Sequence, residues 1–274
     1  MLEETERPTK LRRLCDSDTT KKSLKLIMDF WYLPKENELN PQGEDSLFIC
    51  DEEQVFGVAD GVGGWAKKGI DAGKYARELM LNAAMAVKDG SKGSVNPYTV
   101  LEEAYSKTKA LGSSTACIVA LTDDNFLHSA NVGDSGFMVI RGDNIIYKSE
   151  AQQYRFNCPL QLGNHPQCDR PSSGYEFKVA VEDGDVIVAG TDGLFDNLFE
   201  ENIIEIVKEV TGCIGIYPYR VAQMIAESAK ISSEYNFLPT PFSLEAEMAG
   251  YLHSGGKIDD ITVLVAFVIS SPLA

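Results

Sequence analysis

The sequence is poor in histidine, and its cysteines are widely spaced. There are 3 histidines and 6 cysteines among 274 residues, and no two cysteines form a C-x-x-C pair. A zinc site needs closely spaced Cys or His ligands, so the sequence argues against one. Several cysteines lie inside apolar runs, which is typical of reduced thiols in an intracellular protein.

Basic residues are also few. The 25 Lys and Arg face 41 Asp and Glu, which gives a net charge of −16. This balance argues against binding to nucleic acid or to an anionic membrane. It is compatible with divalent cations, provided that some of the acids converge in space.

Long hydrophobic runs are absent. The longest apolar stretch, Ile261–Ile269, is too short to span a membrane. The first residues lack an apolar core segment, so they do not predict a signal peptide, and their acidic residues make them a poor transit peptide. Targeting is left open by the sequence. We expect residues 1–22 to be a flexible segment and residues 23–274 to form one domain.

Short apolar runs separated by turn residues predict β-strands along most of the chain. Asp, Asn and Gly join several of these runs, and such turns suit antiparallel hairpins. The predicted strands are Leu47–Cys50, Val55–Ala59, Thr115–Leu121, Phe126–Asn131, Phe137–Arg141, Ile145–Lys148, Phe177–Val181, Val186–Ala189 and Ile261–Ile269.

Apolar residues at helical spacing predict helices in pairs. The first begins near Asp71, the expected N-cap, and the second begins at Pro97 and stops at Gly112. The other two span Glu201–Val210 and Pro218–Ile231. Strands joined locally, with helices added in pairs, predict an α+β fold around antiparallel sheets and not a doubly wound parallel sheet.

Acidic residues stand at the ends of several predicted strands. Such carboxylates lie at the rim of a sheet, where several rims can converge on one cleft. Oxygen ligands of this kind suit Mg²⁺ and Mn²⁺, and two such ions support phosphoryl chemistry. Taken singly, each acid is an ordinary turn residue. The acids are Glu44, Asp45, Asp60, Asp134, Asp192, Asp259 and Asp260.

Longer segments around these acids carry a more specific signal. They are Gly43–Ser46, Val55–Gly64, Gly112–Ala116, Asn131–Ser135, Thr191–Asp196 and Asp259–Val263. In this order they resemble the motifs of the PPM (type 2C) family of metal-dependent serine/threonine protein phosphatases. The resemblance extends from about Gly43 to Phe267.

The resemblance implies a four-layer αββα sandwich of two antiparallel sheets flanked by helices, with residues 23–274 as the catalytic domain. It implies hydrolysis of phosphoserine and phosphothreonine in phosphoprotein substrates by direct attack of a metal-bridging water. It also implies two Mg²⁺ or Mn²⁺ ions with a weaker third. We expect a monomer with no nucleic-acid or membrane partner.

The resemblance also assigns roles to individual residues. Asp60 bridges the two metals, the Gly61 carbonyl binds one of them, and Asp192 and Asp259 bind the other. These three aspartates are the catalytic set. Further roles are as follows: Glu44 and Asp45 act largely through metal-bound waters, Asp134 joins Asp192 at the weaker third ion, and Asp196 gives structural support.

Two positions depart from the family pattern. Many members have a general-acid His where this chain has Val62, and a phosphate-binding Arg where it has Asn40. Lys67 and Lys68 are either substitutes for the lost cation or ordinary solvated lysines. These losses keep one alternative open, a pseudophosphatase that acts as a binding or regulatory module.

Three further segments, Phe156–Gly163, Thr240–Ser243 and Gly255–Lys257, resemble the organellar branch of the family. That branch is known in mitochondria and plastids, so the resemblance implies one of these compartments and otherwise the cytoplasm. The loop-rich segment Ser232–Lys257 is either part of a substrate-facing surface or a simple surface excursion.

Two other motifs are rejected. Gly61–Ala66 fits G-x-G-x-x-A, but Asp60 would repel a pyrophosphate and the predicted helix begins too late to bind it. Gly133–Gly136 resembles the nucleophile segment of trypsin-like proteases, but no His lies in a matching context.

Overall fold

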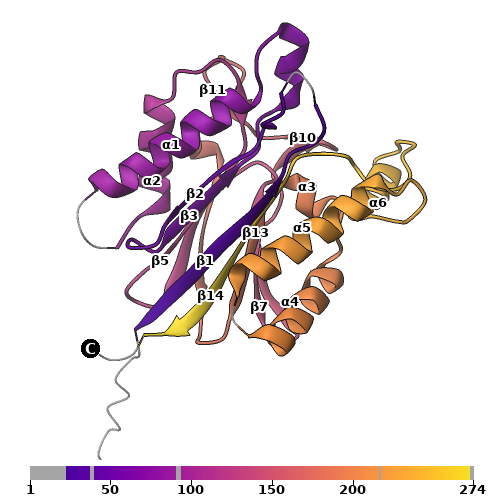
Figure 1. The fold of residues 1–274 in the computed structure, drawn as a ribbon. Coiled ribbons are helices and arrows are strands. Elements are labelled where there is room, and N and C mark those ends of the chain that lie inside the picture. The colour runs from indigo at the N-terminus through magenta and orange to yellow at the C-terminus, as the bar shows by residue number, and fades with distance from the viewer. Residues whose placement is uncertain (1–22, 38–39, 91–93, 216, 272–274) are drawn as a thin grey trace, which may run out of the picture.

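Two five-stranded antiparallel sheets pack face to face and carry helices on their outer faces (Figure 1). The computed structural model describes residues 23–37, 40–90, 94–215 and 217–271, so the predicted flexible segment 1–22 lies outside it. This arrangement is the four-layer αββα sandwich that the sequence predicts, and the predicted fold class is confirmed.

The first sheet has the strand order β1-β14-β13-β7-β8. Its strands are β1 (Leu24–Leu33), β14 (Ile261–Ser270), β13 (Val186–Gly190), β7 (Gly136–Arg141) and β8 (Asn144–Lys148). Its longest pairing joins β1 to β14 and runs from Leu24 opposite Ser270 to Leu33 opposite Ile261.

The second sheet has the order β12-β6-β5-β3-β2. Its strands are β12 (Tyr175–Ala180), β6 (Phe126–Val132), β5 (Ala116–Leu121), β3 (Val55–Ala59) and β2 (Ser46–Cys50). Two short ribbons pair β9 (Gln153–Arg155) with β10 (Cys158–Pro159), and β4 (Ser113–Ser114) with β11 (Leu162–Gly163).

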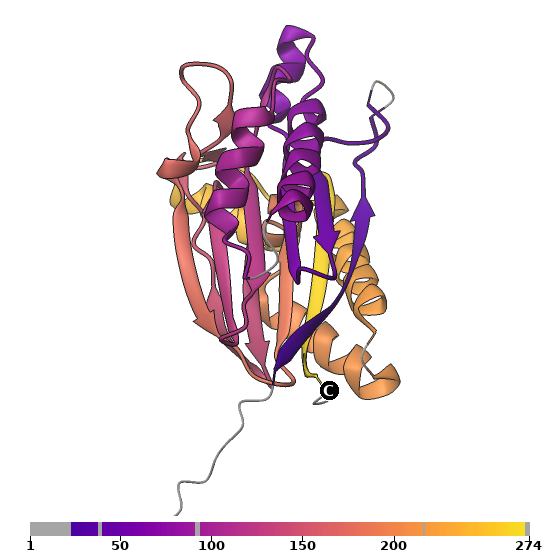
Figure 2. The ribbon, with the colours of Figure 1, turned by 90° about the vertical axis from the view of Figure 1, so that its left-hand side faces the viewer.

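Helices cover both outer faces. Helices α1 (Gly73–Asp89) and α2 (Pro97–Lys107) pack on the second sheet, and α4 (Glu200–Ile214) and α5 (Pro218–Glu234) lie on the side of the first. Figure 2 shows the α1–α2 pair toward the viewer, with strands and then the orange helices behind it. The short helices are α3 (Asp192–Phe195), α6 (Pro241–Met248), and the 3-10 turns η1 (Gly63–Lys68) and η2 (Pro171–Ser173).

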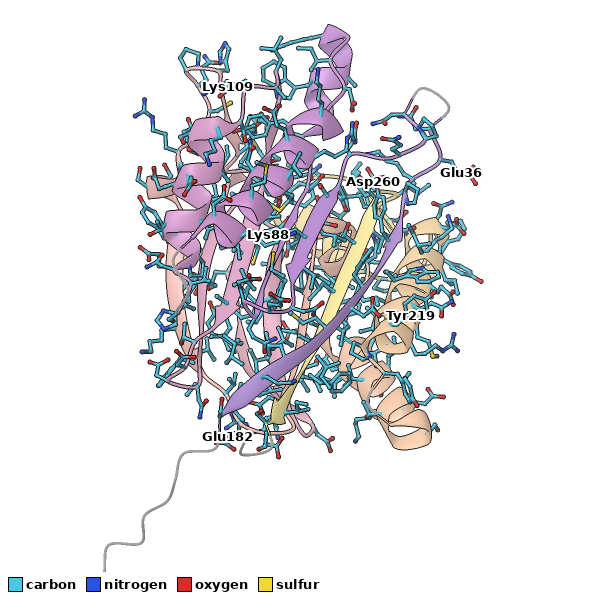
Figure 3. All side chains as sticks on the ribbon, turned by 60° about the vertical axis from the view of Figure 1, so that its left-hand side comes forward. Glu36, Lys88, Lys109, Glu182, Tyr219 and Asp260 are labelled. Carbon is cyan, nitrogen blue, oxygen red and sulfur yellow. The ribbon has the colours of Figure 1, made fainter. Side chains whose placement is uncertain are left out.

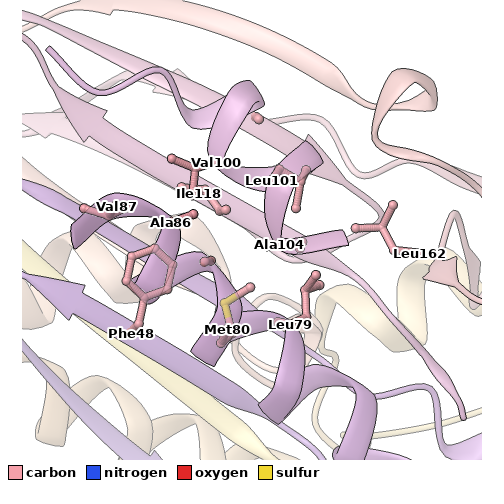
Figure 4. Close-up of a cluster of buried hydrophobic side chains, with 14 of the residues drawn as sticks. Phe48, Leu79, Met80, Ala86, Val87, Val100, Leu101, Ala104, Ile118 and Leu162 are labelled. Atoms are coloured by element: carbon pink, nitrogen blue, oxygen red, sulfur yellow. The ribbon is translucent and has the colours of Figure 1, made fainter. Parts of the chain in front are cut away.

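Three buried clusters fill the spaces between the layers. One lies between α1, α2 and the second sheet, where Phe48, Leu79 and Ile118 meet (Figure 4). Within β3, Val55 faces this cluster, whereas Phe56 faces the cluster between the two sheets. Successive strand residues point to opposite faces, so a strand that is covered on both sides is apolar throughout. This explains why strands such as β3 appear in the sequence as continuous apolar runs.

Several local predictions needed correction. Strand β1 was not predicted, because Asp29 interrupts its apolar pattern and only the pairing with β14 fixes it as a strand. Asp71 is not the N-cap of α1: the N-cap is Ala72, although Asp71 accepts a hydrogen bond from the Gly73 amide at 3.0 Å. The predicted strands and remaining helices are present, with ends that differ by a few residues.

The segment Ser232–Lys257 is not only loop. It contains α6, whose N-cap Thr240 accepts from the Ser243 amide while the Ser243 hydroxyl accepts from the Thr240 amide. Reciprocal bonds of this kind satisfy amides that a helix start leaves unpaired. The Phe242 ring packs at 5.0 Å from Phe156, which joins α6 to the ribbon of β9 and β10.

Candidate metal centre

The acidic residues at the strand ends meet at one end of the sandwich. Figure 3 places the labelled Asp260 at this end and Glu182 at the opposite end. The Lys35 ammonium lies 2.6 Å from Glu44 and 2.9 Å from Asp259, so segments that precede β2 and β14 are neighbours here. Both sheets therefore contribute acids to one cluster.

Asp60 is held at the end of β3 by its backbone. Its amide donates to Thr115 Oγ1 at 3.0 Å, and its carbonyl accepts from the Thr115 amide at 2.9 Å. Burial, followed by the charges of Asp192 and Asp45, raises the pKa of Asp60 well above its usual value. The ionised carboxylate therefore needs a cation close by, and this is what a metal ligand requires.

The Asp45 carboxylate is oriented by hydrogen bonds from two threonines. Its Oδ2 accepts from Thr191 Oγ1 and from Thr262 Oγ1, both at 2.7 Å. Its Oδ1 is buried and has no hydrogen-bond partner among the described residues. Burial, followed by the charge of Asp260, raises the pKa of Asp45 well above its usual value. One oxygen is thus oriented by the protein while the other stays available to a cation.

Asp134 and Asp192 line a common cavity of about 370 Å³. The Oδ1 atom of each is buried without a partner in the described part of the chain. Burial raises the pKa of both groups, and the charge of Asp192 adds to the rise at Asp134. The cavity also reaches Pro241 at the start of α6, so α6 borders the space beside these acids.

Two lysines that the sequence analysis gave no role reach into the cluster. Lys35 contacts Glu44 and Asp259, and also lies 3.3 Å from Asp260 Oδ2. Lys257 pairs with Asp192, with Asp196 at 2.9 Å and with Asp259 at 3.2 Å. Lys257 belongs to a segment that resembles the organellar branch, but Lys35 carries no local signal, because its contacts depend on the distant start of β14.

The lysines change the protonation of the acids. Burial alone would raise the pKa of Asp259, but Lys257 and Lys35 hold it below its usual value. At Asp196, burial outweighs the charge of Lys257, and the pKa of Asp196 is raised to about 7. Burial would lower the pKa of Lys257, yet Asp192, Asp196 and Asp259 raise it well above its usual value. The ammonium groups therefore act as counter-ions of the acids.

The cluster fits divalent cations by its donors and its charge. In the described ranges, no three Asp, Glu, His or Cys side chains already form a coordination shell. The Lys257 ammonium instead pairs with both Asp192 and Asp259. The acids still outnumber the lysines, and the buried, unpartnered oxygens of Asp45, Asp134 and Asp192 suit hard cations.

Gly61 lies where backbone segments approach closely. Its amide donates to the Glu44 carbonyl at 3.1 Å. A Cβ at this position would lie 2.5 Å from the Ala72 carbonyl oxygen and 2.6 Å from that of Glu44. Glycine is therefore required by packing. The metal-binding role of its carbonyl stays a prediction.

The two departures from the family pattern differ in their surroundings. Asn40 donates to the Gly43 carbonyl at 3.0 Å and to Asp71 at 3.2 Å, so it stabilises the turn before Glu44. Val62 borders a separate cavity together with Lys68. The Lys68 ammonium lies 4.3 Å above the Trp65 ring, and neither Lys67 nor Lys68 makes an ion pair within the described ranges.

Known proteins are similar to this chain in fold and in sequence. No family model matches the chain. An Arabidopsis thaliana protein described as probable protein phosphatase 2C 55 is 51% identical over 250 residues, covering 91% of this chain and 53% of the relative. The structure of the photosystem II phosphatase PBCP has a TM-score of 0.83 and 31% identity, covering 90% of this chain and all of that chain.

A more distant structure shows the fold alone. The catalytic domain of the serine/threonine phosphatase PstP, solved with two manganese ions, is 18% identical with a TM-score of 0.62. The match covers 90% of this chain and 100% of that domain. The fold and the acids at its end define the class of αββα-sandwich phosphatases. The chain belongs to the protein phosphatase 2C (PPM) family. It spans about half the length of the first curated relatives that it matches.

Proposed function

We propose that this chain is a metal-dependent phosphatase that hydrolyses phosphoserine and phosphothreonine in proteins. The main support is the convergence of Asp60, Asp192 and Asp259, from the ends of strands in both sheets, on one buried acidic cluster. The family membership supports the same activity. Phosphoprotein substrates follow from this proposal.

We assign Asp60, Asp192 and Asp259 as the residues that would hold two metal ions. We further propose that Glu44 and Asp45 would help to hold the metals through waters, and that Asp134 with Asp192 would hold a weaker third ion. When bound, Mg²⁺ or Mn²⁺ would supply a hydroxide near neutral pH and neutralise charge on the phosphate. The number of ions stays a prediction.

The chain's own residues prepare the site for this chemistry. Thr115 fixes the backbone of Asp60, and Thr191 with Thr262 orients Asp45, so these carboxylates need little rearrangement. The cavity of about 370 Å³ beside Asp134 and Asp192 offers room for part of a substrate next to the acids. Substrate thus approaches a preorganised acidic cluster.

We further propose an organellar location, of which the plastid has the better support. The likeness to a photosystem II phosphatase supports a plastid enzyme. Within the described parts of the chain, no helix combines the length and apolar character needed to cross a bilayer. The binding-module alternative has no support from the described site or from the relatives.

The direct test is hydrolysis of a phosphothreonine peptide by the purified protein with Mn²⁺, with Mg²⁺ and with EDTA. Activity that requires metal and disappears in Asp60→Asn supports the proposal. Folded protein that shows no turnover with either metal would exclude it. Light scattering of the same sample tests the expected monomer.

A further inference from the structure

We propose that Lys35 is the cation that contacts the phosphate group of the substrate, an inference that rests on the proposed function. Lys35 lies two residues after β1. Its ammonium is 2.6 Å from Glu44 Oε2, 2.9 Å from Asp259 Oδ1 and 3.3 Å from Asp260 Oδ2. It therefore stands beside candidate metal-binding acids from both sheets, and a phosphate that metals brought to these acids would be within its reach.

The exposure of Lys35 suits a group that meets a substrate. Its side chain is 24% exposed, whereas that of Glu44 is 6% exposed. Lys35 and Asp259 also border an open cavity of about 320 Å³. The ammonium thus lies at the rim of the cluster, between the acids and the solvent, and a phosphate oxygen can reach it without displacing buried groups.

The other cation of the cluster is placed differently. The Lys257 side chain is 16% exposed, and its ammonium is enclosed by Asp192, Asp196 and Asp259. It also lies 5.4 Å from the Phe242 ring. Lys257 therefore neutralises the buried side of the cluster, and Lys35 is the better placed of the two to meet a ligand.

The remaining nearby cations have other partners. Arg77 donates to the Gly43 carbonyl at 2.9 Å and pairs with Asp71. Lys148 borders the cavity beside Asp134, but its ammonium pairs with Glu200 at 2.7 Å. Among the described residues, only Lys35 and Lys257 make ion pairs with the candidate metal-binding acids.

Physical chemistry explains how Lys35 would exchange its partners. Divalent cations on Glu44 and Asp259 would reduce the attraction of these acids for the ammonium. A phosphomonoester brings new negative charge to the same place. Lysine suits such an exchange, because its ammonium has three donors on a flexible stem and can follow the charge. The predicted ligand is a phosphate group, either as the substrate ester or as free inorganic phosphate.

The test compares Lys35→Met and Lys35→Arg with the control Lys25→Met, which removes an exposed lysine at the other end of β1. Binding of inorganic phosphate to the Mn²⁺-loaded proteins is measured by calorimetry, and KM is measured with a phosphothreonine peptide. A charge-assisted hydrogen bond predicts phosphate binding and KM that are roughly 10- to 100-fold weaker in Lys35→Met. Lys35→Arg retains most of the binding, and Lys25→Met behaves like the wild type.

Titration of Mn²⁺ without phosphate separates contact from support. Lys35→Met should bind Mn²⁺ as tightly as the wild type or more tightly, because a competing cation is gone. A loss of Mn²⁺ binding equal to the loss of phosphate binding would show that Lys35 only shapes the ligand set, and would overturn the inference. Thermal unfolding shows whether each variant folds. If Lys35→Met does not fold, Lys35→Arg is the variant on which the test is decided.

The two proposals can fail separately. Wild-type turnover with unchanged phosphate binding and unchanged KM in Lys35→Met would overturn the inference and leave the proposed function standing. Wild-type protein that binds phosphate through Lys35 without turnover would support the inference and exclude the proposed activity. Binding of the peptide, but not of inorganic phosphate, through Lys35 would assign it to the ester alone.

Discussion

Asp260 Oδ2 accepts a hydrogen bond from the Glu44 amide at 3.0 Å, although the two residues are 216 positions apart. Asp260 Oδ1 accepts from the Lys35 amide at 2.9 Å and from the Tyr32 hydroxyl at 3.2 Å. One buried carboxylate thus fastens the segments after β1 and before β2 to the start of β14. The positions of Glu44 and Lys35 therefore depend on Asp260.

Asp260→Ala should destabilise the metal-free protein by about 2–4 kcal/mol, because it leaves buried amides without an acceptor. Asp260→Asn should cost less, since the amide oxygen still accepts from one of them. Denaturant unfolding in EDTA measures both, and Mn²⁺ titration should show weaker binding in the Ala variant. Equal stability of the wild type and Asp260→Ala would contradict this role.

Asp60→Asn should remove metal binding without unfolding the protein. The substitution takes one charge out of a crowded acidic cluster, so the metal-free variant should be at least as stable as the wild type. Mn²⁺ at about 100 times its Kd should stabilise the wild type by about 2.7 kcal/mol and leave the variant unchanged. Thermal unfolding with and without Mn²⁺ measures this difference.

The matched control for this experiment is Asp143→Asn. Asp143 is exposed and pairs with Lys208 at 2.9 Å. Its loss should change stability by well under 1 kcal/mol and should keep the full response to Mn²⁺. If Asp60→Asn responds to Mn²⁺ as this control does, Asp60 is not a metal ligand.

Lys257→Met should destabilise the metal-free protein more than the metal-loaded protein. Without the ammonium, Asp192, Asp196 and Asp259 lose a largely buried counter-ion, which costs about 3 kcal/mol. Mn²⁺ replaces the lost positive charge, so the gain in melting temperature on adding Mn²⁺ should be larger than in the wild type. An identical gain in both proteins would contradict the counter-ion role.

The stability of the metal-free protein should fall as the pH rises from about 4 to about 7. The pKa values of Asp60, Asp134 and Asp192 are raised by burial, and that of Asp196 is raised to about 7. In this range the folded state binds more protons than the unfolded state, so rising pH favours unfolding. Asp259 has a lowered pKa and works in the opposite direction below its usual range.

Metal binding should reverse this trend, because the acids must lose their protons to bind a cation. The rise in melting temperature on adding Mn²⁺ should therefore be small at pH 5 and large at pH 8. Differential scanning calorimetry of the same protein with Mn²⁺ and with EDTA across this range gives the comparison. A Mn²⁺ effect that does not change with pH would contradict the protonation of these groups.

Much of the site could be predicted from local sequence. Asp60 and Asp192 follow short apolar runs and precede glycines, so their places at strand ends follow from backbone preferences and hydrophobic burial. Asp134 and Asp259 were assigned to the same site because the motifs around them resemble those of one family. The α+β class around antiparallel sheets followed from the same runs, and the order of the four layers followed from the family resemblance.

Other features depended on contacts between distant segments. The sequence around Lys35 resembles an ordinary loop, and the approach of Glu44 and Asp259 gives its ammonium a place in the cluster. Strand β1 exists through its pairing with β14. The short helix α6 needs its capping residues Thr240 and Ser243 and the packing of Phe242 on Phe156.

The sequence by itself determined which acids stand at strand ends and which family they resemble, because these properties are written in neighbouring residues. Only the tertiary structure decided which cations face those acids. The ion pair of Lys35 with Glu44 forms when the two sheets pack, and that of Lys257 with Asp192 forms when β14 pairs with β13; no local pattern encodes such distances.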